Sequence, residues 1–457
     1  MQIINPATGK TVTEVPVPSH TSLLQTYEQA RTAQTTWAET PLSERLAAIR
    51  RFHDLLEAQA PRLAAVLTTE VGKPLPQSRG EIQGALGRIR FFLSQSEKWL
   101  ADEWMTTEGN TLEKISHEPL GVIGNISAWN YPYLVGVNVF IPALIAGNAV
   151  LYKPSEYATL TGLEIGKLLH QAGVPAQAMV VLPGGREVGE ALLDLPLDGY
   201  FFTGSYRTGK YIYERVAPKM VPCQLELGGK DPLYVSADNA NLAQVAAAAV
   251  EGAFYNTGQS CCAVERIYVH ESLYAPFVDE FVRQTRELIT GDPTQEGVFI
   301  GPLTRSEQVA VLEAQVSDAM EKGARLVAGG KRMEGEGYFF EPTVLTDVNH
   351  HMQVMREESF GPIIGIQRVS SDEEAIQLMQ DTDYGLTAAV YADTRQSAEP
   401  ILNKMNTGTV YWNCCDRVSA ALPWSGRKQS GIGATLSYLG IRAFTRPKAY
   451  HLRGKWD

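Results

Sequence analysis

The stretch Gly121-Val-Ile-Gly-Asn-Ile126 decides the fold, because a short run rich in β-branched residues that ends at a polar turn is typical of a buried strand. Similar apolar runs follow at residues 149–152, 179–182 and 199–203. Helix-like spacing of apolar residues fills the intervals at 161–172 and 187–193. Strands that alternate with helices in this way predict a parallel, doubly wound α/β sheet.

Toward the C-terminus the same pattern begins again after residue 230. A strand at 233–236 precedes an alanine-rich helix at 242–256 and a second strand at 266–270. The two patterned regions meet near Leu227-Gly228-Gly229, where a glycine pair permits a hinge or a close approach of two backbones. We therefore expect two doubly wound, Rossmann-like α/β domains.

Toward the N-terminus the first hundred residues have helical spacing, at 21–39, 42–60 and 62–67. Residues 133–152 are apolar over about the length of a membrane span. Pro142 and the pair Gly147-Asn148 interrupt that run, since proline disturbs a helix and Gly-Asn marks a turn. The favoured interpretation is a buried helix, a turn and a buried strand, with no membrane span.

Composition narrows the class of protein. The chain has 457 residues, enough for roughly three domains at about 150 residues each, and its net charge is −11. An acidic chain without a dense basic tract is a poor candidate for binding nucleic acid. Five cysteines are too few for a disulfide framework at this length, and the first residues lack the pattern of a secretory signal. These features favour a globular protein of the cytoplasm.

The segment Phe254-Tyr-Asn-Thr-Gly-Gln-Ser-Cys-Cys-Ala263 holds the best candidate for a reactive group. Its cysteines follow Gly258-Gln259 on a sharp turn that leads into the next strand, where a thiol can face a cleft and be activated by local N–H groups. From the residues alone, Cys261 and Cys262 could equally be buried filler. A metal site is disfavoured, because no further ligand lies at zinc-type spacing.

Two polar residues near strand ends could take part in catalysis. Glu226 lies between two leucines, an environment that raises a carboxyl pKa toward neutrality, although it could simply pair with Lys230. Asn130 follows the strand at 121–126, at the edge where ligands bind doubly wound sheets. Its side chain could donate to a developing oxyanion or cap the helix that begins near Pro132.

Two further strand ends are candidates for nucleotide binding. Lys153-Pro-Ser-Glu156 offers a cation and a carboxylate suited to ribose hydroxyls. Phe202-Thr-Gly-Ser-Tyr-Arg-Thr-Gly209 has the strand, glycine turn and helix start that suit a diphosphate. Neither has GxGxxG spacing and no Walker A sequence occurs, so each could be an ordinary turn.

Taken together and in order, these motifs resemble the NAD(P)-dependent aldehyde dehydrogenase superfamily over nearly the whole chain. The segments that carry the resemblance are Ile4-Asn-Pro-Ala-Thr-Gly-Lys10, Ala128-Trp-Asn-Tyr-Pro132, Lys153-Pro-Ser-Glu156, Phe202-Thr-Gly-Ser205, Glu226-Leu-Gly-Gly-Lys230, Asn256-x-Gly-Gln-x-Cys261, Glu358-Ser-Phe-Gly-Pro362 and Pro423-Trp-Ser-Gly-Arg-Lys-Gln-Ser-Gly431. Each is short, but their joint occurrence in this order is specific. The resemblance makes a filler role for Cys261 improbable.

The resemblance implies a role for each matching residue. Cys261 would attack the aldehyde carbon, Asn130 and the Cys261 backbone N–H would stabilise the oxyanion, and Glu226 would activate the water that hydrolyses the thioester. It also assigns residues to the dinucleotide: Trp129, Lys153, Glu156, Gly204, Ser205, Gly209, Leu227, Glu358 and Phe360. NAD is expected over NADP, because the Glu156 carboxylate accepts from a ribose 2′-hydroxyl and repels a 2′-phosphate; NADP stays possible beside Lys153.

The resemblance also locates the substrate pocket and predicts assembly. The pocket residues would be Tyr133, Leu134, Phe254, Tyr255, Cys262, Cys415 and Arg417. We expect Asp416 and Arg417 to form a solvated ion pair, and a medium-sized aliphatic or aromatic aldehyde to be the substrate. The cofactor domain would comprise 1–100 and 120–228, the catalytic domain 229–428, and a small β element for homodimers or homotetramers 101–119 and 429–457.

Other functions remain open at this point. A semialdehyde or an aminoaldehyde would be a substrate within the same family, Arg417 being able to bind a carboxylate. A dehydrogenase that transfers the acyl group to coenzyme A is disfavoured, because such members generally lack a glutamate at the position of Glu226. A catalytically silent binding protein is disfavoured by the joint presence of Asn130, Glu226 and Cys261.

Overall fold

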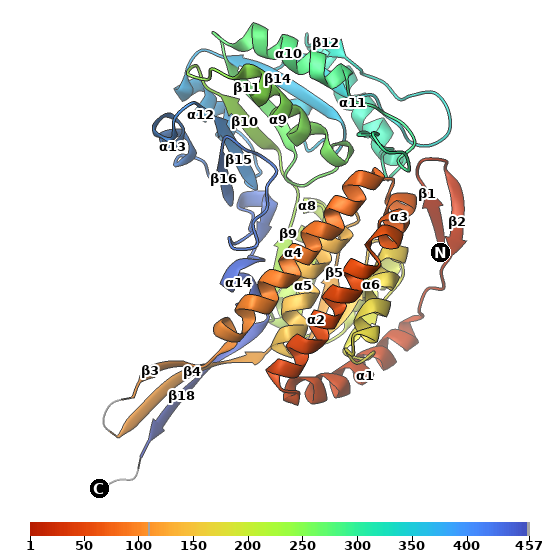
Figure 1. Ribbon diagram of the computed structural model, residues 1–457, viewed down its shortest axis with the longest axis vertical. Helices are drawn as coiled ribbons and strands as arrows, with labels where there is room; N and C mark the ends of the chain where they lie inside the picture. The colour runs from red at the N-terminus through yellow and green to blue at the C-terminus, as the bar shows by residue number, and fades with distance from the viewer. Residues whose placement is uncertain (108–109, 455–457) are drawn as a thin grey trace.

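The computed structural model describes residues 1–107 and 110–454. Two α/β bodies lie one above the other along the long axis, and an arm of strands projects from the lower one (Figure 1). The lower body contains a sheet in the order β17-β9-β8-β5-β6-β7, in which all neighbours are parallel except β17 and β9. Its strands are β5 (Val122–Ile126), β6 (Ala149–Lys153), β7 (Met179–Val181), β8 (Gly199–Thr203), β9 (Cys223–Glu226) and β17 (Gly431–Ile432). The four strands expected at 121–203 are therefore present.

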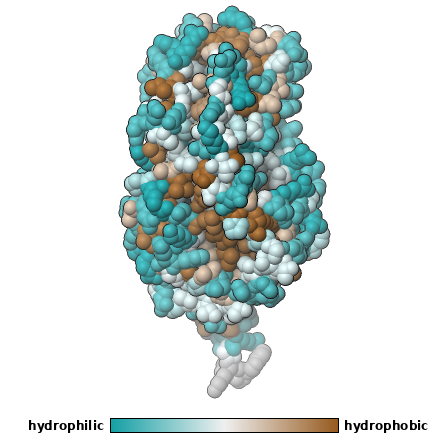
Figure 2. Space-filling view, turned by 90° about the vertical axis from the view of Figure 1, so that its right-hand side faces the viewer, coloured by the Kyte–Doolittle hydropathy of each residue, from teal (hydrophilic) through white to brown (hydrophobic). Residues whose placement is uncertain are grey.

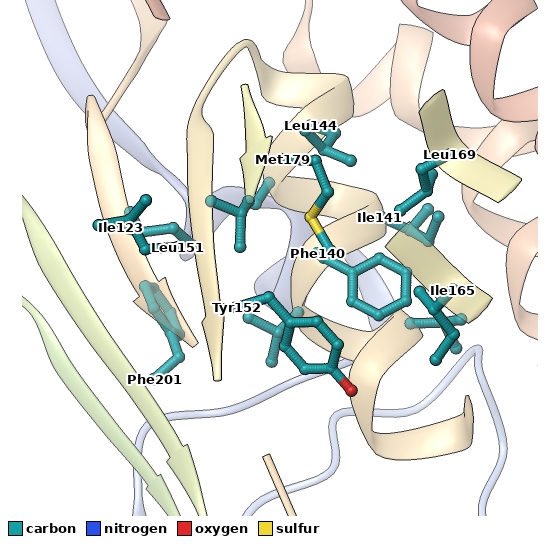
Figure 3. Close-up of a cluster of buried hydrophobic side chains, with 14 of the residues drawn as sticks. Ile123, Phe140, Ile141, Leu144, Leu151, Tyr152, Ile165, Leu169, Met179 and Phe201 are labelled. Carbon is teal, nitrogen blue, oxygen red and sulfur yellow. The ribbon is translucent and has the colours of Figure 1, made fainter. Parts of the chain in front are cut away.

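The helices of this body cover the sheet. They are α1 (His20–Glu39), α2 (Leu42–Ala58), α3 (Ala60–Val71), α4 (Leu75–Leu100), α5 (Pro132–Ala146), α6 (Thr159–Gln171), α7 (Arg186–Asp194) and α8 (Tyr206–Val216). Figure 3 shows part of the core between sheet and helices, where Phe140 of α5 packs against Tyr152 of β6 and Ile165 of α6 lies close by. Because these strands are buried on both faces, their sequences are apolar runs without alternation.

The apolar run at 133–152 forms α5, a turn at Gly147 and β6. Gly147 has a φ of 96° and ends the helix, as the Gly-Asn pair predicted. Nearly every residue of α5 is buried in the protein core. Within residues 1–107 and 110–454, no helix has both the length and the apolar character that a membrane crossing requires.

The upper body contains a second sheet, in the order β12-β13-β14-β11-β10-β15-β16. Its strands are β10 (Asp231–Val235), β11 (Val264–His270), β12 (Arg325–Ala328), β13 (Thr343–Thr346), β14 (Ile363–Val369), β15 (Thr387–Tyr391) and β16 (Thr409–Trp412). All its neighbours are parallel except β12 and β13. The chain passes from the first sheet to the second between Glu226 and Asp231, around the predicted glycine pair.

The helices of the second body are α9 (Leu242–Phe254), α10 (Tyr274–Arg286), α11 (Glu307–Glu321), α12 (Asp372–Gln380) and α13 (Arg395–Leu402). The helix expected at 242–256 ends two residues early, because Asn256 and Thr257 have φ values of 54° and 59°. Helical propensity at these residues is overridden by the turn that presents Cys261.

The projecting arm is a three-stranded antiparallel sheet of β3 (Glu103–Thr106), β4 (Thr111–Pro119) and β18 (Thr445–Arg453). The expected hairpin and tail strand thus share one sheet, while β17 and α14 (Ser437–Arg442), also within 429–457, do not belong to it. A hairpin of β1 (Gln2–Asn5) and β2 (Lys10–Glu14) precedes α1. In the side view of Figure 2 the surface is mainly hydrophilic, with apolar side chains gathered near mid-height.

Candidate active site

Cys261 lies on the turn between α9 and β11, and it is partly exposed. The turn is left-handed at three successive residues, Asn256, Thr257 and Gly258. Gly258 has a φ of 69°, and a Cβ there would lie 2.3 Å from the Gly361 carbonyl oxygen. Glycine is therefore required at this position by both conformation and space. The turn holds the thiol at the rim of a cleft instead of within the core.

Asn130 is buried beside this turn, in the segment between β5 and α5. Its Nδ2 donates to the Gln259 carbonyl at 3.0 Å, two residues before Cys261. The helix α5 has Tyr131 as its N-cap and no side-chain cap bond, so Asn130 does not cap it. The amide donor is therefore directed at the cysteine turn.

A buried ion pair fixes the backbone of Asn130. Lys73 Nζ donates to the Asn130 carbonyl at 2.7 Å, bonds Glu81 Oε2 and lies 3.7 Å from the centre of the Tyr131 ring. Glu81 Oε1 accepts from the Tyr133 backbone N–H at 2.8 Å. The pair thus holds both ends of the segment that carries Asn130, and neither side chain is exposed. Lys73 and Glu81 were not recognised from the sequence.

Glu226 ends β9 and lines the same cleft as Cys261. Both carboxyl oxygens are buried, and neither has a hydrogen-bond partner among the described residues. Burial raises the pKa of Glu226 well above its usual range, and the nearby Thr435 and Gln224 side chains only partly offset this. The simpler interpretation, a pair with Lys230, does not hold, because Lys230 Nζ bonds Glu265 at 2.5 Å.

The cleft beside Cys261 has a volume of about 870 Å³. It brings together eight of the nine residues assigned to the dinucleotide, and these are Trp129, Lys153, Glu156, Gly204, Ser205, Leu227, Glu358 and Phe360. Gly209 lies one helical turn into α8, where a Cβ would come within 2.5 Å of Leu227 Cδ2. Its small size lets α8 pack against the cleft wall.

The part of the cleft nearest β6 and β8 has the groups that a ribose and a diphosphate need. Lys153 is buried, and its Nζ lies 3.9 Å from Glu156 Oε2. Ser205 is the N-cap of α8 and accepts from the Thr208 backbone N–H at 3.4 Å. The helix N-terminus therefore faces the cleft, where its dipole favours a phosphate. The residues fit a dinucleotide at this end.

The part nearest Cys261 has a second carboxylate and two rings. Glu358 Oε1 accepts from the Gly229 backbone N–H at 3.1 Å, and burial raises its pKa to about 8. Phe360 packs edge-on against Trp129, with ring centres 5.5 Å apart. Arg305 also lines this cleft with its Nε enclosed and unpaired among the described residues, a feature that no motif in the sequence indicated.

The predicted pocket residues do not all gather on the opposite side of Cys261. Phe254 is fully buried and packs against Phe281, with ring centres 6.1 Å apart. Cys415 is buried with its Sγ 3.6 Å from the Tyr391 hydroxyl. Tyr133 is enclosed, and burial raises the pKa of its hydroxyl well above its usual range, with smaller contributions from Glu81, Glu164 and Glu70. These three side chains belong to the core, because their rings or thiol fill the space between elements.

Other residues do gather there. Tyr255 and Leu134 are half-buried, and the ring of Tyr131, absent from the predicted set, has Lys73 Nζ 3.7 Å from its centre. Cys262 is buried beside Cys261 and donates its thiol to Asp416 Oδ1 at 2.9 Å. The side chains opposite the cofactor cleft therefore come from α4, from the start of α5 and from the loop after β16.

The expected ion pair between Asp416 and Arg417 is wrong. Asp416 turns inward to Cys262, with a φ of 48°, and burial raises its pKa to about 6. Arg417 points outward and pairs with Glu251, at an N–O distance of 3.6 Å. Adjacent residues on an extended or turning backbone point in different directions, so sequence adjacency did not imply a pair. Arg417 is too exposed to form the floor of a pocket.

Across the described part of the chain, no group of three or more His, Cys, Asp or Glu side chains is arranged to hold a metal ion.

Comparison with known proteins gives a consistent result. Residues 1–450 match the model of the aldehyde dehydrogenase family. The chain is 35% identical to a succinate-semialdehyde dehydrogenase [NADP(+)] of Deinococcus radiodurans, over 97% of this chain and 93% of that protein. It is also 35% identical to the peroxisomal aminoaldehyde dehydrogenase 2 of Pisum sativum, over 96% of this chain and 90% of that protein.

A solved structure agrees. The fold superposes on an NAD-dependent aldehyde dehydrogenase from Sinorhizobium meliloti with a TM-score of 0.96 and 29% identity, covering 99% of this chain and 91% of that one. The proteins similar to this chain thus use NAD or NADP. The expected α/β fold and the resemblance seen in the sequence are confirmed, and this chain belongs to the aldehyde dehydrogenase family of oxidoreductases.

Proposed function

We propose that this enzyme oxidises an aldehyde to its carboxylic acid through a covalent intermediate on Cys261. The observation that carries the proposal is the meeting of the Cys261 thiol, the Asn130 amide and the unpaired Glu226 carboxyl at one end of a dinucleotide-sized cleft. A soft nucleophile, a neutral hydrogen-bond donor and a buried base are the groups that oxidation of an aldehyde through a thioester requires.

In the first step the Cys261 thiolate adds to the aldehyde carbon. Asn130 Nδ2 and the Cys261 backbone N–H donate to the oxyanion, and one such donor is worth about 3 kcal/mol. NAD or NADP, bound in the cleft, supplies the hydride acceptor. The family's general route then leaves a thioester on Cys261.

In the second step Glu226 removes a proton from water, which attacks the thioester and releases the acid. Burial suits this role, because a carboxyl with a raised pKa is a stronger base than one in water. The presence of Glu226 favours hydrolysis over transfer of the acyl group to coenzyme A.

For the cofactor, we propose a preference for NAD. The Glu156 carboxylate lies at the end of the cleft next to Lys153, where it would accept from a ribose hydroxyl and repel a phosphate. The name of the Deinococcus relative gives NADP as its cofactor, which supports the opposite preference. Comparing kcat/KM for the two cofactors decides, and an NADP preference above about tenfold excludes this proposal.

For assembly and location, we propose a homodimer or homotetramer in the cytoplasm. The projecting arm leaves strand edges of β3 and β18 unpaired among the described residues, and a second copy would cover such edges. All five cysteines are free thiols, which a reducing compartment maintains. Light scattering of the purified protein measures the number of copies.

The covalent step is tested with Cys261→Ser. We expect turnover to fall at least about 10⁴-fold, as when a nucleophile is removed from a catalytic set. Intact-mass spectrometry of wild type with aldehyde and NAD should detect an acyl adduct that maps to residue 261. Cys262→Ser is the matched control, because its thiol faces Asp416 and its loss should leave the adduct at Cys261.

A further inference from the structure

Arg88 is a buried cation that the mechanism above does not use. It lies on α4, retains 9% of its surface exposed, and donates from Nη1 to the Leu134 carbonyl at 3.0 Å and to Asn138 Oδ1 at 2.9 Å. No carboxylate of the described chain forms an ion pair with it. A buried arginine without a carboxylate partner is uncommon, because burying an unpaired charge is costly.

The remaining donors of Arg88 are unpaired within the described part of the chain and not fully enclosed. Its Nε and Nη2 groups have no acceptor among the described residues, and neither is among the fully enclosed polar atoms that lack a partner. Arg305 provides a contrast, since its unpaired Nε is fully enclosed. The free edge of the Arg88 guanidinium therefore remains accessible, while its other edge is fixed to α5.

This accessible edge lies near the nucleophile and outside the cofactor cleft. Burial lowers the pKa of Arg88 to about 10, while the nearby Cys262, Glu81 and Cys261 side chains act in the opposite direction. At neutral pH the guanidinium is therefore charged. Arg88 does not line the cleft that holds the dinucleotide residues, and it contacts α5 at Leu134, on the opposite side of Cys261.

The other charges on this side are already bound. Lys73 is paired with Glu81, and Arg417 is paired with Glu251. Asp416 accepts from the Cys262 thiol at 2.9 Å and from Ser260 at 3.5 Å. Among these groups, Arg88 is the cation with donors left for a ligand, and Asp416 is a carboxylate whose acceptor sites are partly filled.

We propose that Arg88 binds the carboxylate of an ω-oxo acid, so that the preferred substrate is a semialdehyde. A planar guanidinium held along one edge presents its other N–H groups in the geometry that a carboxylate accepts. The proposal rests on the proposed function and names its substrate class. The name of the Deinococcus relative agrees with an anionic substrate, whereas that of the Pisum relative indicates a cationic one.

The first experiment uses wild-type enzyme and aldehydes matched in length and different in charge. Succinic semialdehyde, butanal and 4-aminobutanal are compared by kcat/KM with NAD, and five- and six-carbon analogues extend the series. We expect the best semialdehyde to exceed the neutral aldehyde of equal length about 10- to 100-fold, the value of a charge-assisted hydrogen bond. Equal rates, or a preference for the amino compound, overturn the assignment.

The second experiment asks whether Arg88 is the cause. Arg88→Met should lower the ratio of semialdehyde to neutral-aldehyde kcat/KM about 10- to 100-fold, and Arg88→Lys should restore part of it. A loss that is parallel for both substrates, with an unchanged ratio, contradicts a binding role. Arg45→Met is the matched control, because Arg45 binds only backbone carbonyls such as that of Ile145, and its ratio should equal the wild-type ratio.

The outcomes separate the two proposals. If no aldehyde is oxidised at all, the proposed function is wrong. If neutral aldehydes are oxidised and semialdehydes are not favoured, the function stands and the role of Arg88 is wrong. If Arg88→Met does not fold, which its melting temperature reports, the wild-type substrate series still decides the charge preference.

Discussion

On its cofactor side Cys261 faces the carboxyl ends of strands and the turns that follow them, including Lys153 at the end of β6 and Ser205 before α8. On its other side it faces side chains from α4, from the start of α5 and from the loop after β16. The first side is built from short motifs, each contiguous in the sequence. The second is built from single residues that only folding brings together. The two sides therefore differ in how strongly the sequence specifies them.

The largest effect expected on the cofactor side is that of Glu226→Gln. Because the amide cannot accept a proton from water, steady turnover should fall about 10²- to 10⁴-fold, while one equivalent of NADH still forms rapidly. Stopped-flow absorbance measures this burst and the rate that follows it. Unimpaired steady turnover would show that Glu226 is not the base.

The same carboxyl gives a pH dependence. Its pKa is raised by burial, so the basic form increases as pH rises, and kcat for deacylation should rise with pH and then level off above that pKa. In the Glu226→Gln variant the rise of kcat with pH should be absent, and a plot of kcat against pH measures this.

Asn130→Ala tests the point where the two sides meet. Loss of one oxyanion donor should lower kcat about 10²- to 10³-fold, with a smaller change in KM, because the donor acts mainly in the transition state. Steady-state kinetics with a neutral aldehyde measure both constants. A change confined to KM would contradict the assignment.

Lys73→Met sharpens the comparison on the other side, because Lys73 is a positioning residue that touches Asn130 only through its backbone. Combined with Glu81→Gln to avoid a lone buried charge, it should lower kcat by about tenfold in wild type. In the Asn130→Ala background the same change should have little further effect, since its target is gone.

If the Lys73→Met/Glu81→Gln change lowers kcat by the same factor in the wild-type and Asn130→Ala backgrounds, the loss reflects general damage and not the positioning of Asn130. Arg31→Met is the control, because Arg31 also belongs to an ion pair of the lower body, with Asp198 at 2.5 Å, and that pair contacts none of the site residues discussed above. It should lower the melting temperature and leave kcat unchanged.

The smallest effect concerns Glu156→Gln. Removing the carboxylate should shift the ratio of kcat/KM for NAD over NADP toward NADP by roughly five- to tenfold, the size of one partly exposed charge interaction. Cofactor titrations at fixed aldehyde measure the ratio. An unchanged ratio would mean that Glu156 does not sense the 2′ position.

The sequence predicted locally specified elements well and predicted less well those that depend on contacts between distant segments. The strands at 121–126, 149–152, 179–182 and 199–203 and the helices between them are present, with ends displaced by one or two residues. Apolar runs bounded by turns specify such elements locally. The helix expected at 242–256 was too long, because a tertiary requirement, the left-handed turn before Cys261, outweighed helical propensity.

The sequence by itself determined the two α/β sheets, the order of the motifs and the placement of Asn130, Glu226 and the cleft residues near strand ends, because strand ends of a parallel sheet converge at one edge whatever lies elsewhere. Only the tertiary structure decided that Tyr133, Phe254 and Cys415 belong to the core, that Asp416 faces Cys262, and that Lys73 and Arg88 approach the site from α4 and the turn before it. Those positions depend on the rotation and packing of helices against one another, which no local pattern encodes.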